Sequence, residues 1–475
     1  MAKVKTLPCA AEVIRSTRGT TACSRQDKTW VLAVAVLGST MAYIDESVVN
    51  VALPKIQTDL HTTLASMQWI INAYTLCMSA LLLIGGAAAD GFGRRKLFLA
   101  GIVTFAVASV ACGFAPGVAP LVGARAIQGL GAALLIPCSL AIIGAAFDER
   151  ERGAAIGIWS GASALAAGAG PLLGGLLADH LSWRAIFFIN PLIAIPTLWI
   201  AVRRLPESAD PAARVRLDWP GAALVFGGLA SLVYGLISAA TLGWRDVTVV
   251  GSLTAGALLL LGFAWQERRS AAPMMPLALF GSPGFSGVNL LTLFLYGALG
   301  GAFFFLPFLL IEAHGFSATA AGAVYLPFTI VLAVLSRWSG GLVDRFGARW
   351  PLIIGPVIVA VGFALLAILS GEQRYGAYLA PMLVLGLGMA ITVTPLTTTV
   401  INSVKGGETG TASGINNVVA AVASLLAIAV LGTLAANSLV STGRVVMATA
   451  AAMALAAAAV TALTIPSRAQ ATSAG

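Results

Sequence analysis

Long apolar runs separated by short polar loops fill most of this chain. Each run is long enough to cross a bilayer, and together they lie at about 30–53, 68–89, 97–115, 119–146, 153–177, 184–202, 219–240, 247–265, 287–311, 318–342, 351–370, 376–400, 411–436 and 444–465. A spanning helix needs about 20 apolar residues, whereas a barrel strand needs only about 9–11. The pattern therefore predicts an all-α integral membrane protein with about 14 transmembrane helices.

A six-residue pattern, D-x-F-G-x-R, occurs at 90–95 and again at 344–349, which is 254 residues later. It follows the second and the tenth apolar run, in each case a few residues after a pair of glycines. Two six-helix halves with two inserted helices between them would produce this offset. The sequence therefore predicts a tail at 1–29, a six-helix half at 30–203, a linker with two inserted transmembrane helices at 204–286, a second six-helix half at 287–466 and a tail at 467–475.

Composition agrees with a membrane protein, because 58% of the residues are hydrophobic, only 10% are charged and the mean hydropathy is +0.92. The net charge of +9 does not indicate nucleic-acid binding, since the basic residues lie in short loops rather than along one stripe. The five cysteines show no metal-ligand spacing, and neither a Walker loop nor a Ser/His/Asp constellation is present. We therefore expect no cofactor, no metal, no nucleic acid and no enzymatic activity.

The basic residues also predict the orientation. With fourteen helices both termini lie on one face, and 21 of the 28 lysines and arginines fall on that face, against 5 on the other. Arg125 and Arg337 lie inside apolar runs. Cytoplasmic loops carry the excess of basic residues, so both termini are expected in the cytoplasm, with the protein in the inner membrane of the cell.

Two adjacent carboxylates, Asp45 and Glu46, lie in the first apolar run. A charged aspartate at a helix centre costs roughly 2.5–3.5 kcal/mol on insertion scales, so such a group is expected to bind something, and a proton is the simplest ligand. Asp45 lies about 22 Å from the cytoplasmic end of its run, and Arg125 in the fourth run reaches the same level. Arginine keeps its proton whereas a buried carboxylate can take one up, which predicts a proton-coupling pair of Asp45 and Arg125. The alternative is a permanent ion pair that only fixes helix packing, although buried ion pairs contribute little to stability.

Consecutive residues point about 100° apart on a helix, so Glu46 cannot face the same neighbour as Asp45. Glu46 either meets a cationic substrate or faces a water-filled vestibule. Polar and aromatic residues of other runs are further candidates for substrate binding, namely Asn50, Trp69, Asn72, Gln128 and Tyr296. More aromatic residues could line the same cavity, although packing is the commoner role for them: Tyr74, Trp159, Phe303, Phe304, Phe305 and Tyr325.

Several segments together resemble the major facilitator superfamily, and within it the fourteen-helix drug:proton antiporters. They are 85–96 (GGAAADGFGRRK), 125–133 (RAIQGLGAA), Gly157 with 170–175 (GPLLGG), 45–54 (DESVVNVALP), Trp183-Arg184 and 187–190 (FFIN). The resemblance implies two six-helix halves and a multidrug exporter that exchanges protons for a small lipophilic, cationic substrate by alternating access. It also implies a protein that acts as a monomer in the bilayer, with the proton gradient as its energy source.

The resemblance further implies a gate and a helix kink. The gating residues would be Asp90, Gly93, Arg94, Arg95, Asp344 and Arg349. The kink of the antiporters would be formed by Gly170, Pro171, Gly174 and Gly175. The simpler alternative for the gate is that its basic residues only set the topology. The simpler alternative for the kink is a static kink with close packing. For the whole protein, the alternatives are an exporter of one specific antibiotic or metabolite, and less favoured, a polytopic membrane enzyme or a passive facilitator.

Overall fold

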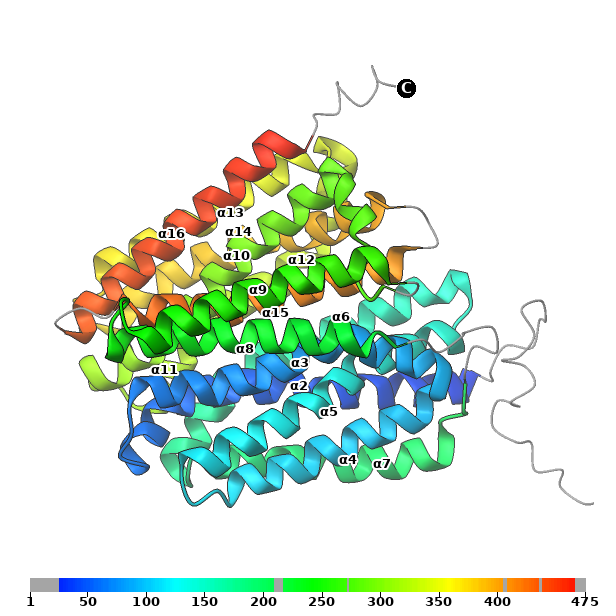
Figure 1. Cartoon of the computed structure of the whole chain (residues 1–475), viewed down its shortest axis with the longest axis horizontal. Helices are drawn as coiled ribbons and strands as arrows, with labels where there is room; N and C mark the ends of the chain where they lie inside the picture. Colours follow the sequence, from blue (N-terminus) through cyan, green and yellow to red (C-terminus); the bar gives the residue numbers. More distant parts are fainter. Residues whose placement is uncertain (1–24, 209–216, 271–272, 405–407, 435–437, 466–475) are drawn as a thin grey trace, which may run out of the picture.

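The computed structural model describes residues 25–208, 217–270, 273–404, 408–434 and 438–465. These residues are almost entirely helical and contain no strand, and fourteen of their helices are long and apolar enough to cross a membrane, as the sequence predicted. Figure 1 shows them running roughly side by side along the long axis of the molecule. The expected tails fall largely on 1–24 and 466–475, which lie outside the described residues.

The first group of six helices is built from the N-terminal part of the chain. Its members are α2 (Arg25–Asp59), α3 (Leu64–Phe92), α4 (Arg94–Gly113), α5 (Val118–Ala146), α6 (Glu149–His180) and α7 (Ala185–Arg204). In this group α2 packs against α5, α6 and α7, and α5 also packs against α3 and α4. We call it the N-terminal half.

The second group follows residue 277 and is separated from the first by a helix pair. Its members are η1 (Leu277–Gly281), α10 (Pro283–Phe308), η2 (Leu309–Ala313), α11 (Ala318–Ala323), α12 (Leu326–Phe346), α13 (Arg349–Leu369), η3 (Tyr375–Tyr378), α14 (Leu379–Asn402), α15 (Thr409–Gly432) and α16 (Leu439–Thr464). We call it the C-terminal half.

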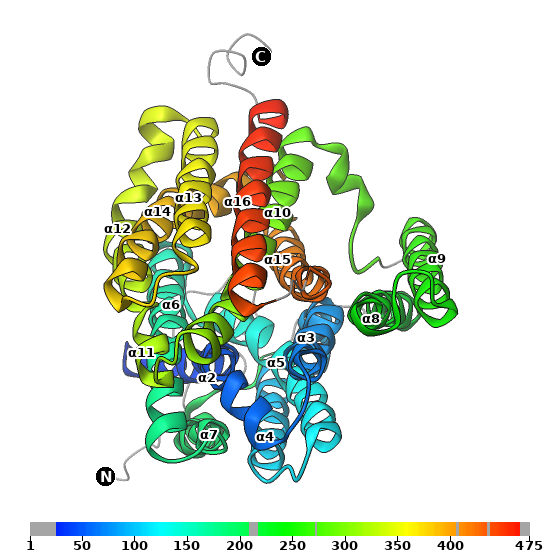
Figure 2. The same ribbon diagram turned by 90° about the vertical axis from the view of Figure 1, so that its left-hand side faces the viewer.

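The helix pair itself consists of α8 (Trp219–Leu242) and α9 (Val247–Arg269). Figure 2 shows both helices at one flank of the bundle, with α9 outermost. Helix α8 packs against α3 of the N-terminal half and α15 of the C-terminal half, whereas α9 packs mainly against α8. The pair therefore covers one of the two seams where the halves meet.

Two apolar runs depart from single α-helices. The run expected at 318–342 is divided into α11 and α12, because Pro327 lies in the first turn of α12 and cannot donate the backbone hydrogen bond that would continue α11. After Pro307, α10 continues as the π-helical turn η2. The first helix is longer than the run that predicted it, since α2 begins at Arg25 and ends at Asp59.

The repeated D-x-F-G pattern corresponds to the same turn in both halves. Helices α3 and α12 end at Gly93 and Gly347, whose φ angles are 107° and 73°. Each glycine N–H donates to a carbonyl four residues earlier, Ala89 and Val343 respectively. Glycine adopts positive φ without the cost that a Cβ imposes, which explains why both copies carry it.

The two halves are in contact at the end of the bundle where α2 ends and α3 begins, at the left of Figure 1. At this end the Gln68 amide donates to the Ile428 carbonyl at 2.6 Å, from α3 to α15. Toward the other end of α6, a Cβ placed on Gly153, Gly157 or Gly161 would meet nothing within 4 Å among the described residues. We call the first end the sealed end and the second the open end.

Candidate functional site

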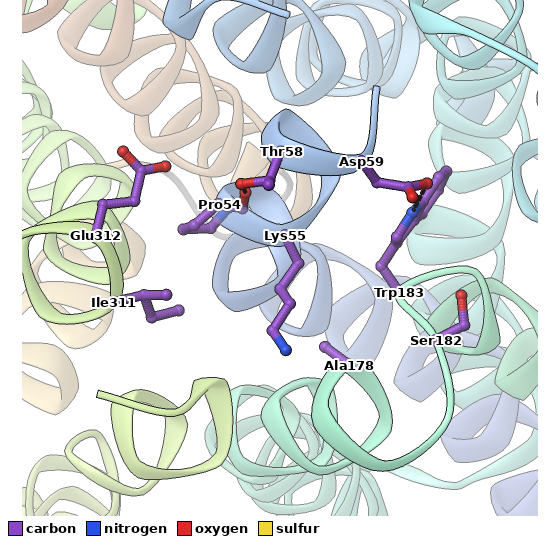
Figure 3. Close-up of a pocket in the computed structure, with 9 residues that line it drawn as sticks. All are labelled: Pro54, Lys55, Thr58, Asp59, Ala178, Ser182, Trp183, Ile311 and Glu312. Atoms are coloured by element: carbon purple, nitrogen blue, oxygen red, sulfur yellow. Dashed lines mark hydrogen bonds between the residues drawn. The ribbon is translucent and has the colours of Figure 1, made fainter. Parts of the chain in front are cut away.

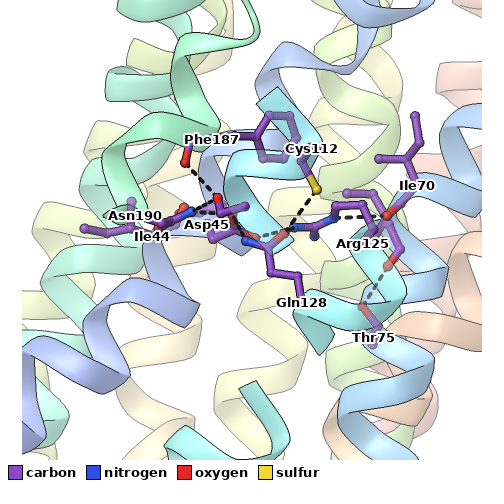
Figure 4. Close-up of polar contacts among 12 residues, drawn as sticks. Ile44, Asp45, Ile70, Thr75, Cys112, Arg125, Gln128, Phe187 and Asn190 are labelled. Atoms are coloured by element: carbon purple, nitrogen blue, oxygen red, sulfur yellow. Dashed lines mark hydrogen bonds and ion pairs between the residues drawn. The ribbon is translucent and has the colours of Figure 1, made fainter. Parts of the chain in front are cut away.

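A cluster of polar side chains surrounds Asp45 in the middle of the N-terminal half (Figure 4). Arg125 Nη1 forms an ion pair with Asp45 Oδ2, so the predicted proximity of these two residues is confirmed. Asp45 Oδ1 accepts hydrogen bonds from Gln128 Nε2 at 2.7 Å and from Asn190 Nδ2 at 2.8 Å. Arg125 is fully buried and Asp45 is 2% exposed.

The partners of Asp45 are themselves held by a second set of contacts. Arg125 Nη1 donates to Gln128 Oε1 at 2.8 Å, and Arg125 Nε donates to the Ile70 carbonyl at 3.3 Å. Asn190 Nδ2 also donates to Ser109 Oγ at 2.9 Å, and the Ser109 hydroxyl donates to a carbonyl of α7. These contacts fix the donors that point at the carboxylate.

Among the described residues, the hydrogen-bond partners of the Asp45 carboxylate are all donors, and an ionised carboxylate is the form that only accepts. Protonation of Asp45 would remove the charge that these donors face and would weaken the contacts that join α2 to α5 and α7.

A cavity of about 440 Å³ lies between the halves, beside this cluster. It is lined from the N-terminal half by α2, α3, α5 and α6 and from the C-terminal half by α10, α12 and α15. Glu46 and Asn50 of α2 lie on its wall, while the adjacent Asp45 points away from it into the cluster. Helix geometry thus separates the two carboxylates, as the spacing predicted.

Some polar groups on the cavity wall lack protein partners among the described residues. Asn50 Oδ1 and the Tyr74 hydroxyl are buried and have no hydrogen-bond partner among the described residues. No hydrogen bond or ion pair of the Glu46 carboxylate is found there either. The rest of the wall is largely apolar and includes aromatic rings from both halves, namely Tyr43, Tyr296, Phe303, Tyr325 and Phe328.

Of the residues expected to bind substrate, Glu46, Asn50 and Tyr296 line the cavity and the other three do not. Trp69 lies on the far side of α3, with its ring 6.4 Å from that of Tyr234 in α8. Gln128 is fully buried in the Asp45 cluster. Asn72 is also fully buried, and neither atom of its amide group has a partner among the described residues.

The other aromatic candidates divide in the same way. Tyr74, Phe303 and Tyr325 lie on the cavity wall. Trp159 packs edge-on against Tyr43, and Phe304 and Phe305 belong to the hydrophobic core of the C-terminal half, which is the packing role given as the alternative.

The described gating residues make contacts within their own half. The Arg94 N–H donates to the Ser208 carbonyl at 2.9 Å, and the Arg95 N–H donates to Glu207 Oε1 at 3.1 Å. Both partners lie in the linker that follows α7. Arg349 Nη2 donates to the Ala462 carbonyl of α16 at 2.8 Å. The side chains of Asp90 and Asp344 lie outside the described part of the structure.

The glycines expected to form a kink lie where α6 approaches two helices at once. A Cβ on Gly174 would meet the backbone of Val48 in α2, and one on Gly175 would meet the backbone of Ala318 in α11. Gly170 faces α2 in the same way, and Pro171 faces α11 through its carbonyl. Helix α6 remains one helix from Glu149 to His180, so close packing of α6 between the halves is what the structure shows here.

The sealed end is closed by a carboxylate that the sequence did not single out. Asp179, in the last turn of α6, accepts hydrogen bonds from the backbone N–H of Ala318 at 3.2 Å and of Thr319 at 2.7 Å, and from the Thr319 hydroxyl at 2.8 Å. Lys55 Nζ lies 3.0 Å from Asp179 Oδ1. A carboxylate is favoured at a helix N-terminus, and here the helix, α11, belongs to the other half.

A second cavity of about 510 Å³ lies beside this contact, and Figure 3 shows the Lys55 amine pointing into it. Ile311 and Glu312 of the C-terminal half form its opposite wall. Asp59, at the end of α2, is held by Trp183 Nε1 at 2.8 Å and Arg184 Nη1 at 2.9 Å.

Sequence reasoning also missed Ser109, Cys112 and Asn190 as members of the Asp45 cluster. Asn190 had a usable signal, because it is an amide inside an otherwise apolar run and must find partners there. Ser109 and Cys112 had none, since small polar residues are common in membrane helices.

Comparisons with known proteins agree with this geometry. The family model described as Major Facilitator Superfamily matches residues 35–428. The chain is 36% identical over 408 residues to the "Tetracenomycin C resistance and export protein" of Streptomyces glaucescens, covering 86% of this chain and 76% of that protein. It is also 36% identical over 408 residues to the "Multidrug resistance protein Stp" of Mycobacterium tuberculosis, covering 86% and 75%.

Among solved structures, the fold is similar to that of the "peptide transporter POT in complex with sulfate", with a TM-score of 0.69 and 15% identity. The match covers 95% of this chain and 97% of that one.

Proposed function

Since the chain belongs to the major facilitator superfamily, a family of membrane transporters, we propose that it exports lipophilic, cationic compounds in exchange for protons. The transporter works by alternating access, as a monomer without a cofactor, and the proton gradient supplies the energy. The names of two relatives, a resistance and export protein and a multidrug resistance protein, support export of toxic compounds.

The observation that carries the proposal is the ring of donors around Asp45. Arg125, Gln128 and Asn190 all donate to its carboxylate and join α2 to α5 and α7. We infer that water that reaches this carboxylate alternately from the two sides of the membrane brings the proton and removes it. Because a proton on Asp45 would weaken the contacts that join α2 to α5 and α7, we expect proton binding and helix movement to be linked.

The cavity supports a cationic, aromatic substrate. Glu46 supplies a carboxyl group that has no hydrogen bond or ion pair among the described residues, and Asn50 Oδ1 supplies a free acceptor. Aromatic rings from both halves suit a flat lipophilic cation, because ring faces attract positive charge. The cavity volume of about 440 Å³ lies in the range of small-molecule sites.

Export of one specific antibiotic is the second candidate, favoured by the relative named for tetracenomycin C. A panel of unrelated cations separates the two candidates, because a specific exporter carries few of them. A passive facilitator would have no use for a buried carboxylate in a ring of donors.

The orientation is part of the proposal. With both termini in the cytoplasm, as the excess of basic residues on their face supports, the sealed end faces outward and the open end faces the cytoplasm. The protein is then in the state that accepts substrate from inside the cell. A reporter fused after Gly475 should be active only in the cytoplasm, and activity only in the periplasm would contradict this topology.

The test of the mechanism compares Asp45→Asn with Glu46→Gln in proteoliposomes under an imposed pH gradient. Asparagine keeps the size of the side chain but cannot carry a proton, so uphill transport of ethidium should be lost while substrate exchange without a gradient persists. The Glu46→Gln variant should keep uphill transport and lose its preference for cationic over neutral substrates. If Asp45→Asn still transported uphill at the wild-type rate, Asp45 would not be the proton site, and Glu46 would become the leading candidate.

A further inference from the structure

Tyr74 of α3 lies between the substrate cavity and the Asp45 cluster. Building on the proposed function, we propose that Tyr74 is a positioning residue whose ring keeps cavity water away from Asp45 and Arg125, and whose hydroxyl binds substrate. The ring and the hydroxyl would then have separate roles in coupling. Each role follows from contacts that the structure shows.

One side of the Tyr74 ring covers the buried charge. The guanidinium carbon of Arg125 lies 4.3 Å from the centre of the ring, which is the geometry of a cation–π contact. Arg125 is fully buried, and Tyr74 is 1% exposed. Tyr74 also lines the cavity, whereas neither Asp45 nor Arg125 does. The ring is therefore part of the wall that separates the cavity from the ion pair.

The protein holds this ring in place from behind. Phe105 contacts it edge-on, with the ring centres 6.4 Å apart. A Cβ on Gly129 would collide with the Tyr74 carbonyl, so only a glycine lets α5 approach α3 this closely. Arg125 Nε donates to the Ile70 carbonyl, one turn earlier on α3. Movement of Tyr74 therefore disturbs Arg125 directly.

The Tyr74 hydroxyl has a different environment. It is buried and has no hydrogen-bond partner among the described residues, although the ring that carries it lines the cavity. A buried hydroxyl without a hydrogen-bond partner is destabilising, so a ligand that offers a partner is favoured there. A substrate bonded to this hydroxyl is in contact with the ring that covers Arg125.

Charged and titratable groups reach this place from three helices. Asp45 and Glu46 come from α2, Arg125 comes from α5, and Cys112 of α4 contacts the cluster through Gln128. Glu46 is the member that stands on the cavity side together with Tyr74. Water in the cavity can thus exchange protons with Glu46 directly, but it meets the Tyr74 ring before the Asp45 pair.

The two roles predict different variants. Tyr74→Ala removes the ring, admits water to the pair and should let protons cross without substrate. Tyr74→Phe keeps the ring and removes only the hydroxyl, so coupling should remain while binding of hydrogen-bonding substrates weakens. Tyr296→Ala is the matched control, because it removes a tyrosine from the same cavity that does not contact Arg125.

The experiment uses proteoliposomes with a trapped pH dye, an imposed pH gradient and no substrate. In the Tyr74→Ala variant the gradient should decay several-fold faster than in the wild type, and uphill ethidium transport should be lost. The Tyr74→Phe and Tyr296→Ala variants should hold the gradient. Tyr74→Phe should raise the KM for ethidium, which carries amino groups, and leave the KM for tetraphenylphosphonium, which has no hydrogen-bonding group, unchanged.

Each failure has its own meaning. A wild type that does not couple ethidium to protons would refute the proposed function. If the wild type couples and Tyr74→Ala still holds the gradient and transports uphill, the role of the ring is overturned. If Tyr74→Phe changes the KM for ethidium and the KM for tetraphenylphosphonium equally, the role of the hydroxyl is overturned. If the alanine variant does not fold, Tyr74→Val keeps part of the packing and gives the same readout.

Discussion

Asp179 offers the most direct test of how the sealed end is held, through the substitution Asp179→Ala. Its carboxylate accepts two backbone N–H groups and one hydroxyl from the start of α11, and all three bonds cross between the halves. A hydrogen bond to a charged group contributes about 1.5–3 kcal/mol. Because the Asp179 side chain is 14% exposed, and water replaces part of each bond when the halves part, we take the low value and count only the two backbone bonds.

Asp179→Ala should then lower the free energy that favours the sealed state by about 3 kcal/mol. Since about 1.4 kcal/mol corresponds to a tenfold change in an equilibrium constant, the ratio of sealed to unsealed molecules should fall roughly a hundredfold. Asp179→Asn keeps an acceptor without the charge, so in this variant the ratio of sealed to unsealed molecules should fall only about tenfold. This ratio should therefore increase in the order alanine variant, asparagine variant, wild type.

The assay is a distance between two spin labels at the sealed end, one on each half. Leu181 follows α6 and Glu372 follows α13, and both are exposed. The labels are placed in a background in which Cys9 and Cys23 are replaced by serine. A second, longer distance should appear in the Asp179→Ala variant and dominate over the sealed one.

The matched control is Asp246→Ala. Asp246 also caps a helix N-terminus with its carboxylate, accepting from the Thr248 N–H at 2.8 Å, but this helix is α9 and the contact lies outside the seam. This variant should give the wild-type distance. If Asp179→Ala also gives the wild-type distance, the carboxylate does not hold the sealed end and the estimate is refuted.

Three further predictions concern the interior and the flank. Arg125→Ala should insert into the membrane but lose coupled transport. Arg125→Lys should restore little of it, because a point charge cannot replace the planar guanidinium that contacts three partners. Full activity of the lysine variant in the proteoliposome assay would contradict this prediction. Gly174→Leu should lower the melting temperature, because its side chain would collide with the backbone of α2, whereas Gly161→Leu has open space and should leave it unchanged. Leu258→Ala and Leu261→Ala on α9, both exposed and far from the cavity, should leave efflux at the wild-type rate; loss of efflux in cells that contain normal amounts of protein would place α9 in the transport path.

The number of helices and the position of Asp45 opposite Arg125 could be predicted from the sequence, because both depend on local counting. A span has a nearly fixed length and a residue on it a nearly fixed depth. The break at Val324 and Tyr325 was not predicted, although Pro327 could have suggested it. The run is apolar throughout, and hydropathy alone does not reveal that Pro327 lacks a backbone N–H.

The direction in which a side chain points is harder to predict. Trp69, Asn72 and Gln128 lie on spans that do line the cavity, but on other faces of them, and a sequence does not fix the rotation of one helix against its neighbours. Asp179 was missed for a related reason. Its partners lie about 140 residues away in the other half, and only the packing of α6 against α11 brings them together.

The placement of α8 and α9 has a consequence for the lipid around the bundle. Of the two long seams between the halves, the one formed by α3 and α15 is covered by α8, while the one formed by α6 and α12 has no further described helix outside it (Figure 2). A lipophilic molecule dissolved in the bilayer therefore meets a bundle with one closed flank and one bare flank. A compound that arrives sideways rather than from the aqueous phase would have to pass between α6 and α12, where both helices carry exposed apolar side chains such as Leu165 and Val334.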